Sequence, residues 1–179
     1  DNGDHNGGTF GFLRSLRKLI VDHRATKVIV CWEGKRSTHR RKKIFSEYKA
    51  NRSIPKRVVR AYDFEETPQN QLKDLKAQLH AVQQYLHLFP VYQLQVEYTE
   101  ADDIIAYLAS YRFPKIEKTI ISNDKDFLQL ISDEVNVYRP ATKKTMGTQE
   151  LLEETGIHPN NWLIVKTIEG DKSDCIPGI

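Results

Sequence analysis

Apolar residues along the chain alternate between a spacing typical of helices and short runs typical of buried strands. The helical spacing of apolar residues predicts helices over residues 9–22, 38–48, 68–88, 100–111, 127–130, 148–155 and 159–168. Runs rich in β-branched residues predict strands over residues 27–32, 91–96, 118–122 and 135–138. Because strands and helices alternate, we predict an α/β domain with a mainly parallel central sheet flanked by helices.

Length and composition limit the class of protein. The chain has 179 residues, of which 39% are apolar and 28% charged, as expected for one folded domain or slightly more. No run approaches the roughly 18 apolar residues of a membrane span, which excludes a transmembrane protein. Cys31 and Cys175 lie far apart and lack metal-ligand spacing. They argue against a disulfide framework or a zinc site and favour a reducing compartment.

Charge is divided unevenly along the chain. Residues 1–60 contain 16 Lys and Arg against 5 Asp and Glu, whereas residues 61–179 contain 11 against 19. The basic part is typical of a surface that faces a polyanion such as nucleic acid. A solvated basic helix beside an ordinary acidic surface would give the same counts, so composition alone leaves both interpretations open.

Four groups of acidic residues follow predicted strands or begin predicted helices. They are Glu33; Glu100, Asp102 and Asp103; Asp124 and Asp126; and Asp171 and Asp174. Each group alone has a structural explanation. Thr99 and Asp102 can form a capping box, and an Asp can cap the helix near Phe127. Together, however, eight carboxylates gathered at the carboxyl ends of a parallel sheet predict a pocket that requires cations.

The candidate ligands are all oxygen atoms, and no Cys or His stands at metal spacing beside them. Oxygen ligands favour hard cations, so we predict Mg²⁺, with Mn²⁺ as a substitute. Two such ions about 3.5–4 Å apart suit phosphodiester hydrolysis, because one activates water while the other stabilises the leaving oxygen. The basic part of the chain would then bind a nucleic-acid backbone.

Four ordered motifs carry a family resemblance. They are Tyr48-Lys49-Ala50-Asn51-Arg52, Glu100-Ala101-Asp102-Asp103, Asp124–Leu130 and Gly170–Gly178. Their order and spacing resemble the 5′-nuclease superfamily: flap endonucleases, bacteriophage 5′→3′ exonucleases and the 5′-nuclease domain of bacterial family-A DNA polymerases. The resemblance implies a PIN-like α/β core that hydrolyses DNA or RNA–DNA at 5′ ends and flaps, in replication or repair, with two or more divalent ions.

The resemblance implies roles for individual residues. The implied metal ligands are Glu33, Glu100, Asp102, Asp103, Asp124, Asp126, Asp171 and Asp174. Lys49 and Arg52 would contact or steer the scissile phosphate, and Tyr48 would stack on a base. A basic helical arch at about residues 35–60 would admit a single 5′ strand through Arg40, Arg41, Lys42, Lys43, Lys49 and Arg52. Glu33 stands where the family usually has Asp, so its carboxylate reaches one methylene further.

The family pattern also sets expectations for organisation and setting. We expect residues 1–155 to form the nuclease core and residues 156–179 to begin a C-terminal DNA-binding helical region. The family's first strand would precede residue 1 and its hairpin would follow Gly178, so we interpret the chain as a fragment truncated in its helix-hairpin-helix region. The expected partner is DNA with a 5′ end or flap, or an RNA–DNA primer hybrid. We expect a monomer, no membrane, and a cytoplasmic location, in the host cytoplasm if the protein is viral.

Three other functions fit parts of the pattern. A PIN-like ribonuclease would share the sheet and acidic pocket but would lack the basic arch and the Gly170–Gly178 motif. A nucleic-acid-binding scaffold, or a catalytically impaired fragment, would bind without cleaving. A metal-dependent phosphomonoesterase would not need the Tyr48–Arg52 segment. Substrate choice and metal dependence separate these alternatives.

Overall fold

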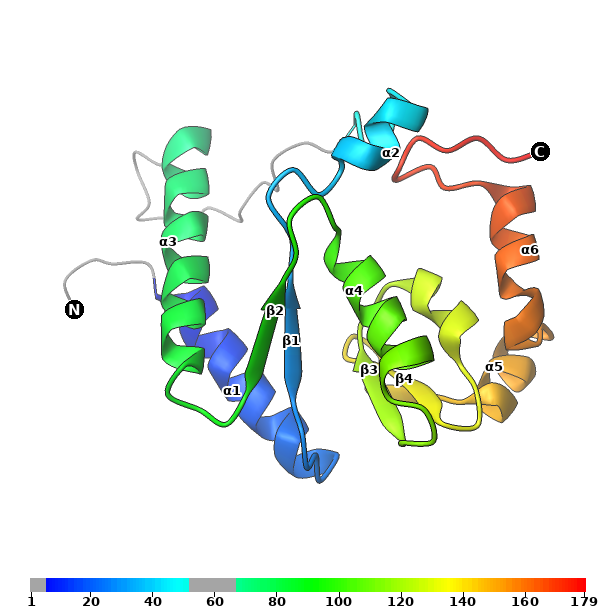
Figure 1. Cartoon of the computed structure of the whole chain (residues 1–179), viewed down its shortest axis with the longest axis horizontal. Coiled ribbons are helices and arrows are strands. Elements are labelled where there is room, and N and C mark those ends of the chain that lie inside the picture. Colours follow the sequence, from blue (N-terminus) through cyan, green and yellow to red (C-terminus); the bar gives the residue numbers. More distant parts are fainter. Residues whose placement is uncertain (1–5, 52–66) are drawn as a thin grey trace. The chain divides into compact units, whose positions relative to one another are not determined.

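The computed structural model describes residues 6–51 and 67–179, which divide into two compact units (Figure 1). Unit 1 lies within residues 1–30 and 53–94, and unit 2 lies within residues 31–52 and 95–179. Among the described residues, no helix is both long and apolar enough to cross a membrane. The expected boundary between residues 155 and 156 differs from this division and stays a prediction.

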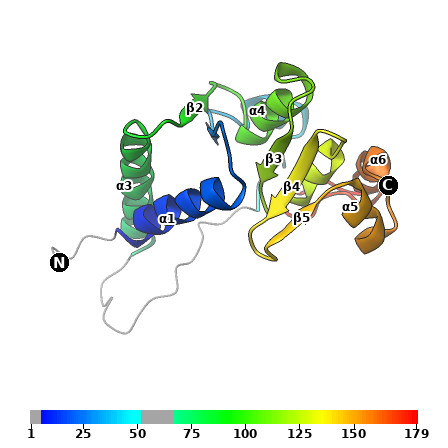
Figure 2. The same cartoon turned by 90° about the horizontal axis from the view of Figure 1, so that it is seen from below.

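Unit 1 is built on two helices that lie side by side, α1 (Gly7–Asp22) and α3 (Pro68–Leu86) (Figures 1 and 2). The Gly8 amide donates to Oε1 of Gln78 at 2.7 Å, and the Thr9 hydroxyl donates to the Gln78 carbonyl at 3.2 Å. Thr9 therefore ties the two helices together inside α1. The helix predicted from residue 9 begins two residues earlier, at Gly7.

Two strands connect the units along the chain. β1 (Ile29–Trp32) is hydrogen-bonded to β2 (Tyr92–Gln95), and each strand has residues in both units. Both strands were predicted, each with one or two residues more at its ends. Glu33 follows β1 directly, so the end of this strand positions the first candidate site residue.

Unit 2 contains a three-stranded sheet in the order β3 (Lys118–Ile121), β4 (Val135–Arg139), β5 (Lys144–Met146). β3 and β4 are parallel, with Ile120 opposite Val137, and β4 and β5 are antiparallel. The parallel pair and the α/β class confirm the predicted fold class. β5 was not predicted, because its three residues, Lys-Thr-Met, carry no apolar run.

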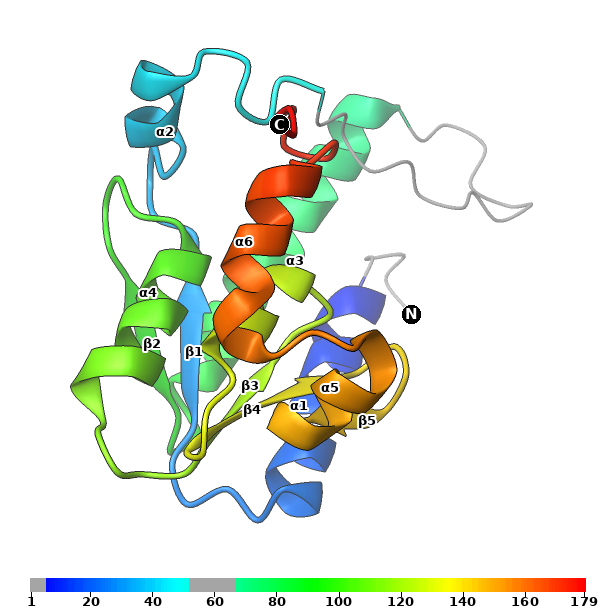
Figure 3. The ribbon, with the colours of Figure 1, turned by 90° about the vertical axis from the view of Figure 1, so that its right-hand side faces the viewer.

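Helical segments pack around this sheet (Figure 3). They are α4 (Ala101–Tyr107) with its π-helical extension (Leu108–Arg112), the 3₁₀ helix η2 (Lys125–Leu130), α5 (Thr148–Thr155) and α6 (Pro159–Glu169). A short helix, α2 (His39–Ile44), lies apart from the sheet. The core they enclose consists of Ala109, Ile120, Phe127, Leu128, Ile131, Val135, Val137, Met146, Leu151 and Trp162. Burial of these side chains fixes η2 and α6 against the strands that carry the candidate site.

Two predicted helix boundaries in unit 2 are wrong. The helix predicted through Tyr48 ends at Ile44, because Phe45 has an extended backbone. Glu100, rather than Thr99, is the N-cap residue of α4, and it makes no side-chain cap bond. The Thr99 hydroxyl donates instead to the Glu97 carbonyl at 3.2 Å, so the expected capping box does not form.

Candidate functional site

A glycine brings the loop after β1 against the segment that leads into α4. The Gly34 amide donates to the Thr99 carbonyl at 3.1 Å, and a Cβ at Gly34 would lie 1.8 Å from the Val96 carbonyl oxygen. Only glycine permits so close an approach of the two backbones. The Gln95 side chain adds a hydrogen bond to the Glu33 carbonyl at 2.7 Å. Glu33 is thereby held near the acids that begin α4.

Glu100 lies at the centre of a buried ionic network, and its side chain is only 2% exposed. One of its oxygens, Oε1, accepts from the Lys49 ammonium, and Oε2 accepts from Arg41 and from the Tyr48 hydroxyl, the latter at 2.9 Å. A buried carboxylate is stable only when its charge and lone pairs are satisfied in this way. We call Glu100, Arg41, Tyr48 and Lys49 the Glu100 cluster.

Arg41 extends this cluster to the protein surface. Its guanidinium donates to both carboxylate oxygens of Asp103, at 2.8 and 3.0 Å, while it also contacts Glu100. Tyr48 is 6% exposed, and its ring lies beneath the Arg41 and Lys49 cations. Burial and the hydrogen bond to Glu100 raise the pKa of Tyr48 well above its ordinary value. The hydroxyl therefore stays protonated and acts as a donor.

Asp102 lies among other acids. Burial of its carboxyl raises the pKa of Asp102, and the negative charges of Asp124, Glu33 and Glu100 raise it further, while Lys49 lowers it. Carboxylates from two other segments therefore act on Asp102, although the strands that precede them, β1 and β3, belong to different sheets. A cation beside Asp102 would relieve their repulsion.

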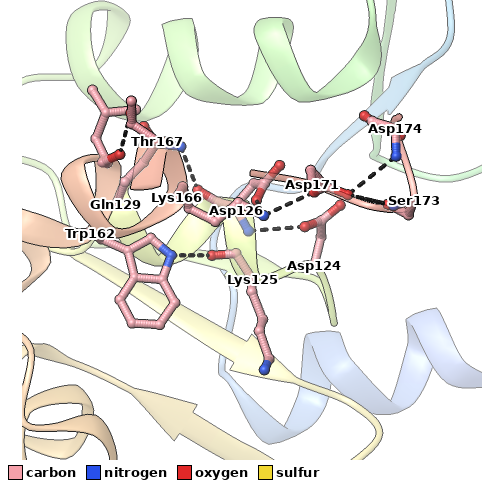
Figure 4. A network of polar contacts seen from close by, with 11 residues as sticks. Asp124, Lys125, Asp126, Gln129, Trp162, Lys166, Thr167, Asp171, Ser173 and Asp174 are labelled. Atoms are coloured by element: carbon pink, nitrogen blue, oxygen red, sulfur yellow. Dashed lines mark hydrogen bonds and ion pairs between the residues drawn. The ribbon is translucent and has the colours of Figure 1, made fainter. Parts of the chain in front are cut away.

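The turn after β3 orients two more carboxylates. Asp124 is the N-cap of η2, and its Oδ1 accepts from the Asp126 amide at 2.9 Å. The Asp124 amide in turn donates to the Ser122 hydroxyl at 3.0 Å. Asp124 thus does have the capping role expected of an ordinary Asp, and its second oxygen remains outside that bond. Asp126 points toward α6 (Figure 4).

The loop after α6 folds around Asp171. The Asp171 oxygen Oδ1 accepts from the Ser173 amide at 2.8 Å, the Ser173 hydroxyl at 2.6 Å and the Asp174 amide at 3.2 Å. Its Oδ2 accepts from the Lys166 ammonium at 2.9 Å. The hydrogen bonds from Ser173 and Lys166 hold the pKa of Asp171 well below its ordinary value. Asp171 is therefore ionised throughout the neutral range.

Lys166 joins this loop to η2. Its ammonium lies 2.9 Å from Oδ1 of Asp126 as well as 2.9 Å from Oδ2 of Asp171 (Figure 4). Although partial burial alone would lower the pKa of Lys166, the contacts with Asp171 and Asp126 raise it above its ordinary value. We call Asp126, Lys166, Asp171 and Ser173 the Asp171 cluster.

The Glu100 cluster contacts the loop after α6 through the Lys49 backbone. The Lys49 amide donates to the Asp174 carbonyl at 3.1 Å, and the charge of Asp174 acts on Tyr48. Lys49 has a φ of 56°, so its backbone is left-handed at this contact. Unit 2 therefore contains all four groups of acidic residues, and this contact joins the Tyr48-Lys49 segment to the loop that carries the last group.

The predicted nucleic-acid-binding residues have different environments. Arg41 and Lys49 are engaged with acids, whereas Arg40, Lys42 and Lys43 are exposed on α2. Arg52 lies outside the described residues. The resemblance suggests Tyr48 for base stacking, but Tyr48 is buried and its hydroxyl donates a hydrogen bond to Glu100.

The donor chemistry suits a hard divalent cation, since the candidate groups are carboxylates and the buried oxygen Oδ1 of Asp126 already faces a cation, the Lys166 ammonium. Across residues 6–51 and 67–179, no three His, Cys, Asp or Glu side chains stand in a metal-binding arrangement. The individual ligand assignments stay predictions.

Sequence reasoning missed Lys166 altogether. A lysine in the last turn of a helix has an ordinary role at the negative helix end, so nothing marked it as part of a site. The available signal was its spacing, five residues before Asp171 across the helix end. Trp162 was likewise predicted only as a helix residue, yet its indole N–H donates to the Lys125 carbonyl at 2.9 Å and fixes α6 against η2.

Comparison with known proteins identifies relatives of this chain. A 5′-3′ exonuclease of Bacillus subtilis (strain 168) is 32% identical over 189 residues, which covers 100% of this chain and 56% of the relative. A DNA polymerase I of Rhizobium leguminosarum is 30% identical, over 97% of this chain and 16% of the polymerase. The chain thus spans about half the length of the exonucleases that it matches.

The fold also matches a solved structure. The bacteriophage T5 D15 flap endonuclease, in a complex with DNA and metal ions, superimposes with a TM-score of 0.75 at 22% identity, covering 98% of this chain and 64% of that one. The sequence model of the family described as "5′-3′ exonuclease, N-terminal resolvase-like domain" matches residues 1–156. The chain therefore belongs to the 5′-3′ exonuclease family, within the 5′-nuclease superfamily that its motifs resemble.

Proposed function

We propose that the protein is a divalent-metal-dependent 5′ nuclease that hydrolyses phosphodiester bonds of DNA at 5′ ends and flaps. The observation that carries this proposal is the proximity, within unit 2, of acids from three segments, Glu33, Asp102 and Asp124, beside the cation Lys49. Carboxylates supply the ligands for metal ions, and the neighbouring cations supply contacts for a phosphate. Family membership supports the same reaction.

Divalent ions would be held by the acids that the sequence singled out. Asp102, Glu33 and Asp124 are the first candidates, because their mutual repulsion raises the pKa of Asp102 and a cation would remove that cost. Asp126, Asp171 and Asp174 would serve a second ion. When bound, such ions activate water and stabilise the leaving oxygen of the phosphodiester. We propose Mg²⁺ as the natural ion, with Mn²⁺ as a substitute.

The protein's own residues would orient the substrate. Lys49 and Arg41 lie beside the acids, and a DNA phosphate would join Glu100 and Asp103 as a further acceptor for their N–H groups. The exposed side chains of Arg40, Lys42 and Lys43 would follow the backbone of the strand by charge alone, without sequence preference. The name of the T5 relative, a flap endonuclease in complex with DNA, supports this substrate class.

Similarity to DNA polymerase I supports a role in replication or repair. An RNA–DNA primer hybrid would be accepted because the contacts proposed here are to the backbone. The monomeric state and the cytoplasmic location remain proposals based on sequence.

A second candidate function is nucleic-acid binding without cleavage. It is favoured by the ion pairs that neutralise Glu100, Asp103, Asp126 and Asp171 within the protein. If those pairs persisted with substrate bound, the acids would act only as structural anchors. Binding would then be indifferent to divalent ions.

The test is cleavage of a 5′-labelled flapped DNA duplex by the protein in its natural full length. Mg²⁺, Mn²⁺ and EDTA are compared, with a blunt duplex and a single-stranded RNA as alternative substrates. Metal-dependent release of the flap or of short 5′ fragments supports the nuclease, whereas preference for RNA supports a PIN-like ribonuclease. Tight binding with no cleavage in either metal supports the binding function and contradicts our proposal.

A further inference from the structure

We propose that Lys166 and a divalent cation compete for the same two carboxylates, those of Asp126 and Asp171. Lys166 would hold these carboxylates together while the cation is absent and would give way when it binds. The inference rests on the metal dependence proposed above, and it assigns Lys166 a role as a positioning residue.

The geometry of the Asp171 cluster is that of an internal counter-ion. The Lys166 ammonium lies 2.9 Å from Asp126 and 2.9 Å from Asp171, which come from η2 and from the loop after α6 (Figure 4). Only 24% of the Lys166 side chain is exposed. α6 and η2 pack together, and the Trp162 indole bonds to the Lys125 carbonyl, so the ammonium is held over the gap between the two acids.

The oxygens that Lys166 occupies are the ones that a cation would use. Three N–H and O–H donors within the loop already fill Oδ1 of Asp171, which leaves Oδ2 as the oxygen facing Lys166. Oδ1 of Asp126 is a buried atom that faces the same ammonium at 2.9 Å. A cation that binds these two oxygens must therefore displace the ammonium.

This arrangement has opposite effects in the two states. Without a metal ion, the carboxylates of Asp126 and Asp171 repel one another, and the ammonium between them offsets that repulsion. With a metal ion, the same ammonium is a competitor and then a neighbouring like charge, both of which weaken metal binding. Lys166 therefore stabilises the metal-free protein at the expense of metal affinity.

The experiment measures metal binding and stability rather than cleavage. Lys166→Met keeps the length of the side chain and removes its charge, and Lys166→Arg keeps the charge. Lys172→Met is the matched control, because Lys172 is an exposed lysine next to Asp171 in the loop after α6. Bound Mn²⁺ is counted by electron paramagnetic resonance during a titration of each full-length protein, and the thermal unfolding midpoint is measured in EDTA.

We expect Lys166→Met to bind Mn²⁺ about three- to tenfold more tightly than wild type, the effect of losing one competing ion pair. In EDTA its midpoint should fall by about 2–4 °C. Lys166→Arg should restore both values toward wild type, and Lys172→Met should change Mn²⁺ affinity less than Lys166→Met does. A general effect of positive charge would instead make the two Met variants alike.

Equal or weaker Mn²⁺ binding by Lys166→Met, with wild type binding measurably, overturns the competition and leaves the proposed function intact. If wild type and variant both fail to bind Mn²⁺, the proposed metal chemistry itself is wrong, and the inference falls with it. A Lys166→Met protein that does not fold is replaced by Lys166→Gln, to which the same expectations apply.

Discussion

The Glu100 cluster and the Asp171 cluster both pair acids with cations, but they differ in burial. Glu100 is almost completely buried, and it takes one hydroxyl and two cations from residues 41–49. Asp126 and Asp171 retain 46% and 21% of their side-chain exposure and share one cation from α6. The first cluster connects distant segments of unit 2, whereas the second lies between α6, the loop that follows it and η2.

This difference in burial predicts that one cluster contributes mainly to stability and the other mainly to catalysis. A buried charge that loses its partners is costly, so the Glu100 cluster is expected to hold the site together. Replacing a partly exposed acid that has a single displaceable cation lowers the free energy of unfolding less, and such an acid is accessible to ligands. The Asp171 cluster should therefore contribute more to catalysis than to folding.

The largest effect on stability is expected from Glu100→Gln. The variant removes the negative charge between Lys49 and Arg41, and we expect it to lower the free energy of unfolding by about 3 kcal/mol. Asp103→Asn, which removes the exposed partner of Arg41, should cost less than about 1 kcal/mol. Urea denaturation measures both. Similar losses in the two variants would show that burial does not distinguish them.

Asp126→Asn should have the converse effect. It removes a candidate metal-ligand charge from a partly exposed position, so cleavage of a flapped duplex should fall by at least about a hundredfold while flap binding survives. Asp133→Asn, an exposed acid in a turn outside both clusters, is the control. Single-turnover cleavage and binding in Ca²⁺ are measured. Unchanged turnover in Asp126→Asn would remove this residue from the site.

Lys49→Ala tests whether a residue of the buried cluster also meets the substrate. We expect turnover to fall about tenfold or more, while the Kd for a flapped duplex rises less than about threefold, because the contact is made mainly during the reaction. Lys73→Ala, an exposed lysine on α3, should change neither value. Weakened affinity with normal turnover would instead make Lys49 a docking contact.

The smallest effect concerns pH. Hydrogen bonds from Ser173 and Lys166 lower the pKa of Asp171 from its ordinary value of 3.8. Its contribution to stability is thus complete above that value and disappears as pH falls through the lower pKa of the folded state. Asp171→Asn should be less stable than wild type by about 1 kcal/mol at about pH 7, and the difference should shrink toward about pH 2.5. Urea denaturation at both pH values measures this difference in the free energy of unfolding. A difference that stays constant between the two pH values would contradict the linkage.

Much of the site could be predicted because it follows local rules. Glu33 and Asp124 come directly after or near the ends of buried strands, where a β-branched run ends and a turn begins. The four groups of acidic residues were therefore expected to converge, and the influence of Asp124 and Glu33 on the pKa of Asp102 agrees with this for three of the groups. The ligand set itself stays a prediction.

The rest depends on contacts between distant segments. Tyr48 reads as an exposed aromatic residue beside basic neighbours, and only the position of Glu100, 52 residues later, explains its burial. Lys166 reads as an ordinary helix-end lysine until η2 brings Asp126 to it. Local patterns contain no information on such pairs, so neither the buried network nor the shared ammonium was predictable.

The most direct test of the account is the Mg²⁺ dependence of flap cleavage in wild type and in Asp102→Asn. Asp102 is the acid whose neighbours most clearly favour a bound cation. We predict no cleavage by wild type in EDTA, full recovery with Mg²⁺, and a requirement for at least about tenfold more Mg²⁺ in Asp102→Asn. Cleavage that persists in EDTA, or an Mg²⁺ requirement that Asp102→Asn leaves unchanged, would contradict a metal-dependent site built on these carboxylates.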